Sequence, residues 1–482
     1  MRQHILWDVI FIFLIAFFLF TRFYKLPTSF FYFNDMGRDS LALLDWAQTG
    51  KPPLLGPQTS ALPFNQGAVY YYLLYPLFRL MQHSPFSAIL TSAIVYVVTF
   101  SALFYFLRNK PTQVRALFVS IFFITIIPQY IIQQRFVWNP SLATPFLLIS
   151  FFSFLALREK FSLLKVGIFA LAIALATTMS YSVLTVLFAY IVYSAVVFRK
   201  KLKEFGIILI SLVTAILFVN LPTLLFEVRH HFLLTHMLLT VPRMSQTGLS
   251  PWAKLAKISE YSFSLTNNNF NILAGVIFFL LIAAAVFFAL RKRNIAEKYR
   301  DFTTASLLFL LTLIFALLVP VGIQMHYTFG LLTLGIICIA FLPLPLIFLL
   351  SIAGAVLWFP FLLSGQYFAR APRTVAEMQS CFRQICAEHR EPLFVTVQAS
   401  FHPYHTGWEH RFLMREAGCD VVAIETDPNA AQTMALIGDD AQYEPGKTTF
   451  SELTTFGPAQ QTQLYTCTNK FRVYILKKKA LR

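Results

Sequence analysis

Three charged side chains gather in the first polar stretch after the N-terminal apolar segment. Asp35 and Asp39 are four residues apart, and Arg38 lies between them in the sequence. On a helix this spacing places both carboxylates on one face. A carboxylate held in this way can act as a general base. The alternative is a structural role, in which Asp35 is stabilised by the helix dipole and pairs with Arg38.

The neighbouring residues predict the helix that carries this cluster. Asn34 is a favourable N-cap and Gly50 a favourable stop, so we expect a helix over residues 35–49. Its leucines and Trp46 give it an apolar side. Such a helix suits the surface of a membrane.

The composition of the chain excludes a soluble globular protein. Of 482 residues, 57% are hydrophobic, 53 are Phe and 13% are charged, which is more apolar surface than a soluble core can bury. The net charge is +17, and its excess lies in residues 1–364, which hold 26 Lys and Arg against 10 Asp and Glu. Membrane proteins collect such residues in cytoplasmic loops, so we infer a lipid bilayer as partner and no nucleic acid.

Apolar stretches long enough to cross a membrane recur along residues 1–364. We interpret the first as an uncleaved span, because no small-residue cleavage site follows it. The fold class expected is therefore a multi-pass α-helical membrane protein with about 11 transmembrane helices. The predicted spans lie near residues 5–21, 85–107, 114–129, 140–157, 163–179, 181–198, 205–226, 270–290, 302–320, 327–342 and 343–362.

Clusters of basic residues predict which side of the membrane each loop occupies. The predicted spans place four such clusters on one face, which the positive-inside rule makes cytoplasmic. The N-terminus is then cytoplasmic, and the long loops 22–84 and 227–269 are external. Residues 365–482 are external as well. The four clusters lie in residues 108–115, 158–165, 199–203 and 291–300.

Residues 365–482 have the pattern of a small extracytoplasmic α/β domain that follows the transmembrane domain of residues 1–364. Periodicity predicts helices over 374–390 and 408–419 and strands over 392–400, 420–426 and 463–477. Cys381 and Cys386 are poorly spaced to bridge each other. Cys419 and Cys467 can pair with each other or with one of those two.

The acidic residues argue against an ion-coupled transporter. All ten Asp and Glu of residues 1–364 fall outside the predicted spans or at their ends. A transporter of this kind keeps an ionisable group within the membrane. The polar residues lie instead in external loops, which favours chemistry at the outer surface.

Five segments in order along residues 1–345 resemble the membrane glycosyltransferases of the GT-C fold. The resemblance is closest to the protein O-mannosyltransferases and the aminoarabinose transferases, the GT39-like branch. We find no resemblance for residues 365–482. The segments are TRFYKLPTSFFYFNDMGRDSLALL, GPQTSALPFNQGAVYYYLLYPL, RFVWNPSLATPF, LPTLLFEVRHHF and MHYTFG.

The resemblance implies a reaction and a place for it. A sugar linked to a polyprenyl phosphate is the donor, and a glycan, lipid or protein acceptor attacks its anomeric carbon at the external face of a prokaryotic plasma membrane. Asp35 matches the essential acid of the family's first external loop and would take the acceptor's proton. Asp39 and Arg38 belong to the same catalytic cluster. The leaving phosphate gains charge and needs cations nearby.

The resemblance and the predicted topology also suggest residues for the donor phosphate and sugar. Arg135 has a structural alternative, as an arginine whose stem is buried at the interface, and the histidines have another, as a hydrated interfacial cluster. Tyr70, Tyr71 and Tyr72 fit an aromatic belt better than a sugar platform. The donor-binding candidates are Arg135, Asn139, Arg229, His230, His326 and Tyr327.

The sequence departs from the family where relatives carry further acids. Asp35 is followed by Met36 rather than by a second acid, and residues 129–140 contain none. A bound Mg²⁺ or Mn²⁺ is therefore in doubt, although Asp35 and Asp39 are its candidate ligands. The histidines of the segment HPYHTGWEH are spaced wrongly for ligands on one helix face.

The function that these patterns favour is a polyprenyl-phosphate-dependent glycosyltransferase of the cell envelope. A transporter or flippase for a lipid-linked saccharide is the first alternative. An O-antigen-type ligase or polymerase, which uses a lipid-diphosphate donor, is the second. The C-terminal domain would bind the acceptor or cap the site.

Overall fold

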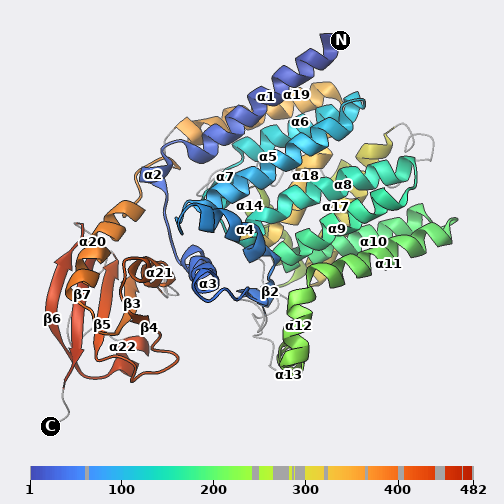
Figure 1. The fold of residues 1–482 in the computed structure, drawn as a ribbon. Coiled ribbons are helices and arrows are strands. Elements are labelled where there is room, and N and C mark those ends of the chain that lie inside the picture. Colours follow the sequence, from blue (N-terminus) through green and yellow to red (C-terminus); the bar gives the residue numbers. More distant parts are fainter. Residues whose placement is uncertain are drawn as a thin grey trace. The chain divides into compact units, whose positions relative to one another are not determined.

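The structure is a computed structural model of the whole chain. It describes residues 2–59, 65–240, 249–263, 280, 282–284, 287, 299–319, 324–363, 367–399, 407–439, 451–468 and 471–479. The chain forms two compact units (Figure 1). The first unit comprises Met1–Tyr24, Pro53–Pro76 and Ala88–Tyr367, and the second comprises Lys25–Pro52, Leu77–Ser87 and Phe368–Arg482.

The first unit is a bundle of apolar helices with a two-stranded antiparallel sheet. Helix α4 (Val69–Leu80) begins in this unit and ends in the second. The sheet pairs β1 (Leu55–Gln58) with β2 (Asn65–Gly67). The other helices are α1 (Arg2–Phe23), α5 (Ser87–Leu107), α6 (Pro111–Ile126), α7 (Pro128–Arg135), η1 (Asn139–Leu142), α8 (Ala143–Glu159), α9 (Leu163–Met179), η2 (Tyr181–Val183), α10 (Leu184–Val197), α11 (Leu202–Val219), α12 (Leu221–Arg229), α13 (Leu233–Thr240), α14 (Pro251–Phe263), α17 (Arg300–Leu318), η3 (Met325–Thr328), α18 (Phe329–Ala340) and α19 (Leu344–Leu363).

These helices confirm a multi-pass helical membrane protein. Within the described residues, five are long and apolar enough to cross a membrane, and the bent pair α6–α7 would make a sixth. Four further predicted spans coincide with shorter apolar helices. The predicted span at 270–290 lies mostly outside the described residues, so the count of eleven stays a prediction. The five are His4–Phe23, Ser87–Leu107, Asn139–Glu159, Leu202–Val219 and Arg300–Leu318.

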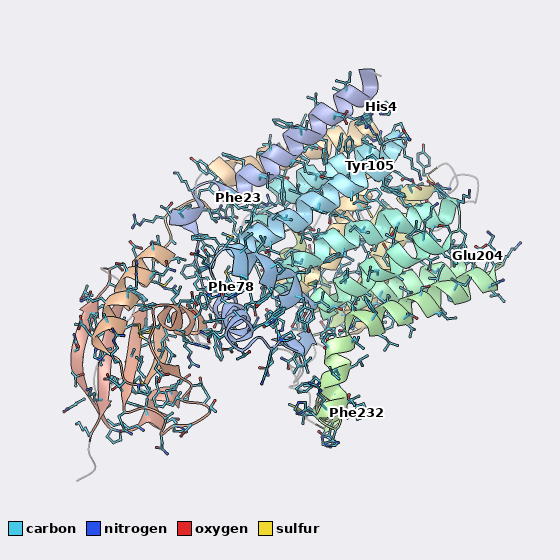
Figure 2. All side chains as sticks on the ribbon, in the orientation of Figure 1. His4, Phe23, Phe78, Tyr105, Glu204 and Phe232 are labelled. Atoms are coloured by element: carbon cyan, nitrogen blue, oxygen red, sulfur yellow. A yellow bond between two sulfur atoms is a disulfide. The ribbon has the colours of Figure 1, made fainter. Side chains whose placement is uncertain are left out.

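Aromatic side chains fill much of the space between the helices of the bundle. Phe154 of α8 packs against Phe169 of α9 and Tyr190 of α10, with ring centroids 5.3 and 5.2 Å away. Aromatic contacts of this kind add to the packing energy of large apolar side chains. Figure 2 shows Glu204 at the start of α11, at one end of the bundle, and Phe232 beyond α12, on the short helical arm that projects from the bundle.

The second unit is a mixed sheet with helices on both faces. Strand order is β4 (Val421–Val422), β3 (Leu393–Ala399), β5 (Thr433–Asp439), β7 (Phe471–Lys478) and β6 (Ala459–Thr466). Strands β4, β3 and β5 are parallel, whereas β7 is antiparallel to both β5 and β6. The helices are α2 (Leu26–Ser29), α3 (Asp35–Thr49), α20 (Val375–Glu388), α21 (Trp408–Glu416) and α22 (Ser451–Phe456).

Alternate residues of each strand face opposite sides of this sheet. On one face Phe394, Met434 and Leu476 form a buried core with Phe456 of α22. On the other face Phe471 contacts Phe382 of α20 and His410 of α21, with ring centroids 6.0 and 5.4 Å away.

The structure corrects the predicted strands in three places. Strand β5 was not predicted, although it is central in the sheet. The single strand expected over 463–477 is two antiparallel strands. The strand expected over 420–426 is only the two residues of β4.

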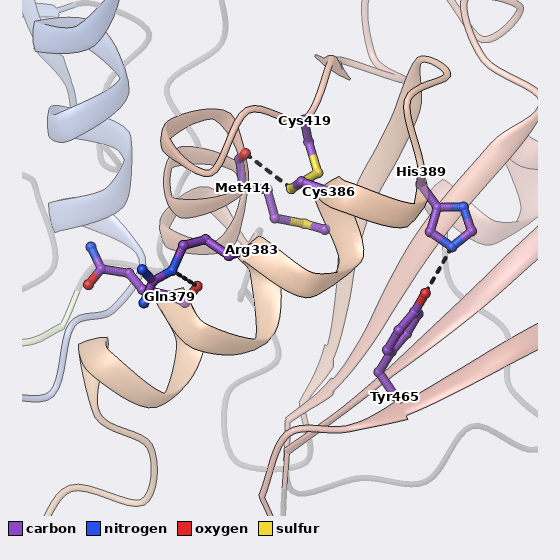
Figure 3. Close-up of a disulfide and its surroundings, with 7 residues drawn as sticks. All are labelled: Gln379, Arg383, Cys386, His389, Met414, Cys419 and Tyr465. Carbon is purple, nitrogen blue, oxygen red and sulfur yellow. Dashed lines mark hydrogen bonds between the residues drawn. A yellow bond between two sulfur atoms is a disulfide. The ribbon is translucent and has the colours of Figure 1, made fainter.

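Two disulfides tie α20 to other parts of the second unit. Cys381 is bonded to Cys467, and Cys386 to Cys419. Figure 3 shows the second bond, between α20 and the segment that follows α21. This pairing settles the alternatives that the spacing left open. The fifth cysteine, Cys338, is free and buried in the first unit.

Candidate functional site

The cluster that opens α3 is formed as the spacing predicts. Nη1 of Arg38 lies 2.8 Å from Oδ1 of Asp35, and Nη2 lies 2.9 Å from Oδ1 of Asp39. The side chain of Asp39 is 4% exposed, whereas that of Asp35 is 29% exposed. Arg38 therefore links a buried carboxylate to one that an external molecule can reach.

Helix α3 has the predicted bounds, but its start differs from the prediction. Asn34 provides no side-chain cap, and its backbone has φ 34° and ψ −96°. This conformation, with a positive φ and a strongly negative ψ, is strained for a residue with a side chain. The stop is as predicted, because Gly50 adopts the left-handed conformation with φ 69°.

Within the second unit, two buried charged residues hold the segment before Asp35. Oε2 of Glu409 accepts a hydrogen bond from the backbone N–H of Asn34 at 3.0 Å. Arg373 donates to Oε1 of Glu409 and to the carbonyl oxygen of Tyr32, each at 2.9 Å. Burial also raises the pKa of Tyr32 well above its usual range, so its hydroxyl stays protonated.

Two candidate donor-binding residues lie together in the first unit, at the break between α7 and η1. Nη1 of Arg135 donates to the carbonyl oxygens of Arg22 and Tyr24, at 3.0 and 3.2 Å. These carbonyls end α1, so Arg135 caps that helix. Nδ2 of Asn139 donates to Oε1 of Gln66 and to the carbonyl oxygen of Met179, each at 2.7 Å.

Trp138 joins a third candidate to this group. Its ring lies edge-on to His326, with centroids 4.5 Å apart, and its indole N–H donates to Gln133. His326 in turn lies against Tyr327, with ring centroids 4.2 Å apart. The first unit thus brings His326 and Tyr327 to Trp138, the residue that precedes Asn139. The guanidinium of Arg135 contacts the end of α1 instead.

The other two donor-binding candidates lie on a different element of the first unit. Arg229 ends α12 and His230 follows it, and both side chains are exposed. His230 stacks on Phe226, with ring centroids 4.2 Å apart. Helix α12 packs against α11, α13 and β1. Its exposed basic end suits contact with an anion.

The acids of α3 do not form a cation site. Among the described residues, no three His, Cys, Asp or Glu side chains gather as metal ligands. The guanidinium of Arg38 lies against both Asp35 and Asp39 and occupies the place that a divalent ion would need. His402 and His405 lie outside the described residues, and His410 is buried beside Glu409. The side chains of this cluster therefore do not fit a divalent metal ion.

Comparison with known proteins identifies the fold. No protein-family model matches the chain, and no curated protein sequence matches it. Among solved structures, that of ArnT from Cupriavidus metallidurans in the apo state matches with a TM-score of 0.50 at 14% identity. The chain shares the fold of ArnT. The match covers 97% of each chain.

The ArnT match extends what the motifs led us to expect. The GT-C fold predicted from residues 1–345 is confirmed, while assignment to the GT39-like branch stays a prediction. Because the match covers 97% of this chain, it also includes residues of the C-terminal domain, for which the sequence showed no resemblance.

Arg373 and Glu409 were not among the residues predicted from the sequence. Glu409 lies in the segment HPYHTGWEH, where the histidines drew attention as metal ligands. No local pattern marks either residue, because Glu409 is 375 residues from Asn34 and Arg373 is 341 residues from Tyr32. What marks these two residues as important is that both are charged and fully buried. Their burial is visible only in the structure.

Proposed function

We propose that the chain is a glycosyltransferase of the GT-C fold and of its GT39-like branch. It moves a sugar from a polyprenyl-phosphate donor to a glycan, lipid or protein acceptor. The reaction takes place at the external face of a prokaryotic plasma membrane. The external loops 22–84 and 227–269 and the domain of residues 365–482 would serve it on that side.

One observation carries this proposal. Asp35 is a partly exposed carboxylate, held by an arginine at the first turn of α3, in a chain with the fold of ArnT. Its place shortly after the first span is where the resemblance puts the family's essential acid. A fixed carboxylate that a substrate can reach meets the geometric need of a general base.

The chemistry assigned to Asp35 is a proton transfer coupled to substitution at the anomeric carbon. The acceptor oxygen forms a bond to that carbon, and the carbon's bond to the phosphate oxygen breaks. The carboxylate of Asp35 takes the acceptor's proton, and the polyprenyl phosphate leaves with an added negative charge. Arg38 and Asp39 hold Asp35 in place.

The leaving phosphate needs positive charge to stabilise it. We assign this task to Arg135, Arg229, His230 and His326. Asn139 and Tyr327 would contact the sugar. Since Arg135 also caps α1, its capping contacts would fix the direction of its guanidinium.

The disulfides support the external placement of the C-terminal domain. Disulfides persist in oxidising compartments and are rare in the cytosol. Both described bridges lie within residues 381–467. The basic loops lie on the opposite side of the predicted spans, and this also supports an external C-terminal domain.

The test uses purified full-length protein in nanodiscs with radiolabelled polyprenyl-monophosphate sugars and a membrane extract that supplies glycan, lipid and protein acceptors. We expect wild-type protein to release the lipid phosphate and Asp35→Asn to lose at least about 100-fold in rate, since general bases contribute about 10²–10⁴-fold. Asp45→Asn is the matched control, because Asp45 lies on the same helix, is 58% exposed and pairs with Arg415. The control should keep wild-type activity.

The alternatives predict different results in the same assay. Full activity of Asp35→Asn would refute the assignment of the base. Turnover of lipid-diphosphate donors only would identify a ligase. Movement of donor across liposomes without any new glycosidic bond would identify a flippase.

A further inference from the structure

The segment that leads into the proposed base belongs to the same compact unit as the C-terminal domain. Residues 25–52 and 368–482 are parts of the second unit. Helix α3 packs along α21 there, which places the first turn of α3 against the C-terminal domain. This contact can therefore affect the position of Asp35.

The two helices approach each other closely at Gly37, two residues after Asp35. A Cβ added at Gly37 would lie 2.0 Å from the backbone nitrogen of Glu409 and 2.3 Å from its Cα. No side chain fits in that space, so the two backbones touch. The axis of α3 at its first turn is therefore fixed by α21.

A buried ion pair holds the chain just before this turn. The side chains of Arg373 and Glu409 are 1% and 0% exposed and lie 2.9 Å apart. Glu409 accepts the N–H of Asn34, and Arg373 donates to the carbonyl oxygen of Tyr32. The pair thus binds the backbone on both sides of residue 33.

The backbone conformation of Asn34 explains why the Arg373–Glu409 pair, hereafter the clamp, is needed. Its φ of 34° and ψ of −96° are unfavourable for a residue with a side chain. A strained conformation persists only where its surroundings hold it, and such residues cluster at functional sites. Releasing the N–H of Asn34 would let the chain relax, and the first residue to move would be Asp35.

We propose that Arg373 and Glu409 are positioning residues that hold the carboxylate of Asp35 in its reactive direction. The C-terminal domain thereby becomes part of the catalytic machinery rather than only a platform for the acceptor. This inference rests on the proposed function. Neither residue needs to contact the substrate, because both act through the backbone of Tyr32 and Asn34.

The experiment compares Glu409→Gln with Arg415→Gln in full-length protein in nanodiscs. Arg415 also joins α21 to α3, through Asp45 at 2.7 Å, but at the far end of α3 from Asp35. The kinetic readout is kcat and KM for a polyprenyl-monophosphate sugar. The structural readout is hydrogen exchange of the amides of residues 34–38.

We expect Glu409→Gln to lower kcat about 100-fold, the scale of a reactive group displaced by about 1 Å, with KM for the donor nearly unchanged. Its amides at 34–38 should exchange at least about tenfold faster, which corresponds to a loss of about 1.4 kcal/mol in local opening free energy. Arg415→Gln should match wild type in both readouts. If both variants lost kcat equally, the contact between α3 and α21 would matter only for holding the two helices together. That result would overturn the proposal.

Gly37→Ala gives the same test without leaving a buried charge unpaired. Its Cβ would push α3 away from α21, so kcat should fall while KM stays nearly constant. If Glu409→Gln fails to fold, Gly37→Ala still tests whether the contact with α21 positions Asp35. Normal kcat in a folded Gly37→Ala protein would overturn the proposal.

The two readouts separate this inference from the proposed function. Wild-type activity with an unchanged kcat in Glu409→Gln would refute the positioning role and leave the function standing. No donor turnover by wild-type protein, together with faster exchange in Glu409→Gln, would refute the function and with it the catalytic meaning of the clamp.

Discussion

Arg22 supplies hydrogen bonds at the point where Pro128 removes one. Pro128 has no N–H, so the carbonyl oxygen of Ile124 loses its helical partner, and the chain bends by 69° between α6 and α7. The guanidinium of Arg22 donates to the carbonyl oxygens of Ile124 and Thr125 at 2.7 and 2.9 Å. Within a bilayer, irregular backbone is tolerated only where such partners exist.

Arg22→Met should therefore destabilise the protein by about 2–6 kcal/mol, since each of two buried carbonyls left without a donor costs about 1–3 kcal/mol. The measurement is the free energy of unfolding in detergent. Pro128→Ala is the matched background, because it restores an N–H that can bond to Ile124. We expect Arg22→Met to cost less there, and an equal cost in both backgrounds would contradict this account.

Glu227 caps α13, and this contact should depend on pH. Its carboxylate accepts the backbone N–H groups of Leu234 and Thr235 at 2.9 and 3.0 Å, and also the hydroxyl of Thr235. Burial raises the pKa of Glu227, but these hydrogen bonds together lower it below its usual value of 4.5. The folded state therefore favours the carboxylate.

The sign of the pH effect follows from that lowered pKa. The stabilising contribution is fully present above about pH 4.5 and is lost as pH falls through the lower pKa of the folded state. Hydrogen exchange of α13, corrected for intrinsic rates, should show protection falling in that range. Glu227→Gln should remove this dependence, whereas Glu260→Gln, at an exposed position of α14, should leave it intact.

Local patterns explain which elements were predictable. Helix α3 ends at Gly50 as predicted and helix α20 follows the predicted amphipathic pattern, because a stop signal and apolar periodicity are encoded within a few residues. The cluster of Asp35, Arg38 and Asp39 was predictable for the same reason, since its members are three or four residues apart or adjacent.

Strand β5 was not predictable, because its sequence lacks the alternation that marks a half-buried strand. The run TMALIGD contains one β-branched apolar residue, Ile437, and a glycine, Gly438. Buried central strands have short apolar runs that periodicity cannot distinguish from helix. Likewise, the clamp of Arg373 and Glu409 on Asn34 depends on contacts across hundreds of residues, which no local pattern encodes.

The pairing of the cysteines predicts a labelling result. Alkylation in denaturant without reductant should modify one cysteine, Cys338, and alkylation after reduction should modify all five. Mass spectrometry of peptides checks both. Labelling of all five without reductant, in protein purified from its native membrane, would contradict an oxidising compartment for residues 365–482.

Loss of a disulfide should also lower stability. The Cys386–Cys419 bond closes a loop with a sequence separation of 33 residues, so Cys386→Ala with Cys419→Ala should cost about 2–4 kcal/mol. The measurement is the unfolding midpoint of the second unit, followed in the full-length protein. Cys338→Ala, which removes no bond, should shift that midpoint far less.

Asn139 offers a test that separates a ligand contact from an internal one. Its amide donates to Gln66 of β2 and to the carbonyl oxygen of Met179 at the end of α9. Asn139→Ala removes both bonds and leaves a buried carbonyl oxygen, so it should cost about 1–3 kcal/mol of unfolding free energy. Asn139→Asp should cost more, because a carboxylate would face two acceptor oxygens in a buried place.

The kinetics of the same variants decide between the two roles. A contact made only to the donor sugar would raise KM and leave stability unchanged. A side chain that bonds only within the protein would lower the free energy of unfolding in proportion to the hydrogen bonds lost. It would alter KM only by displacing β2. We expect lower stability together with a higher KM, because Asn139 is buried and directly follows Trp138, whose ring lies against His326. A KM effect with wild-type stability would show that Asn139 acts on the donor alone.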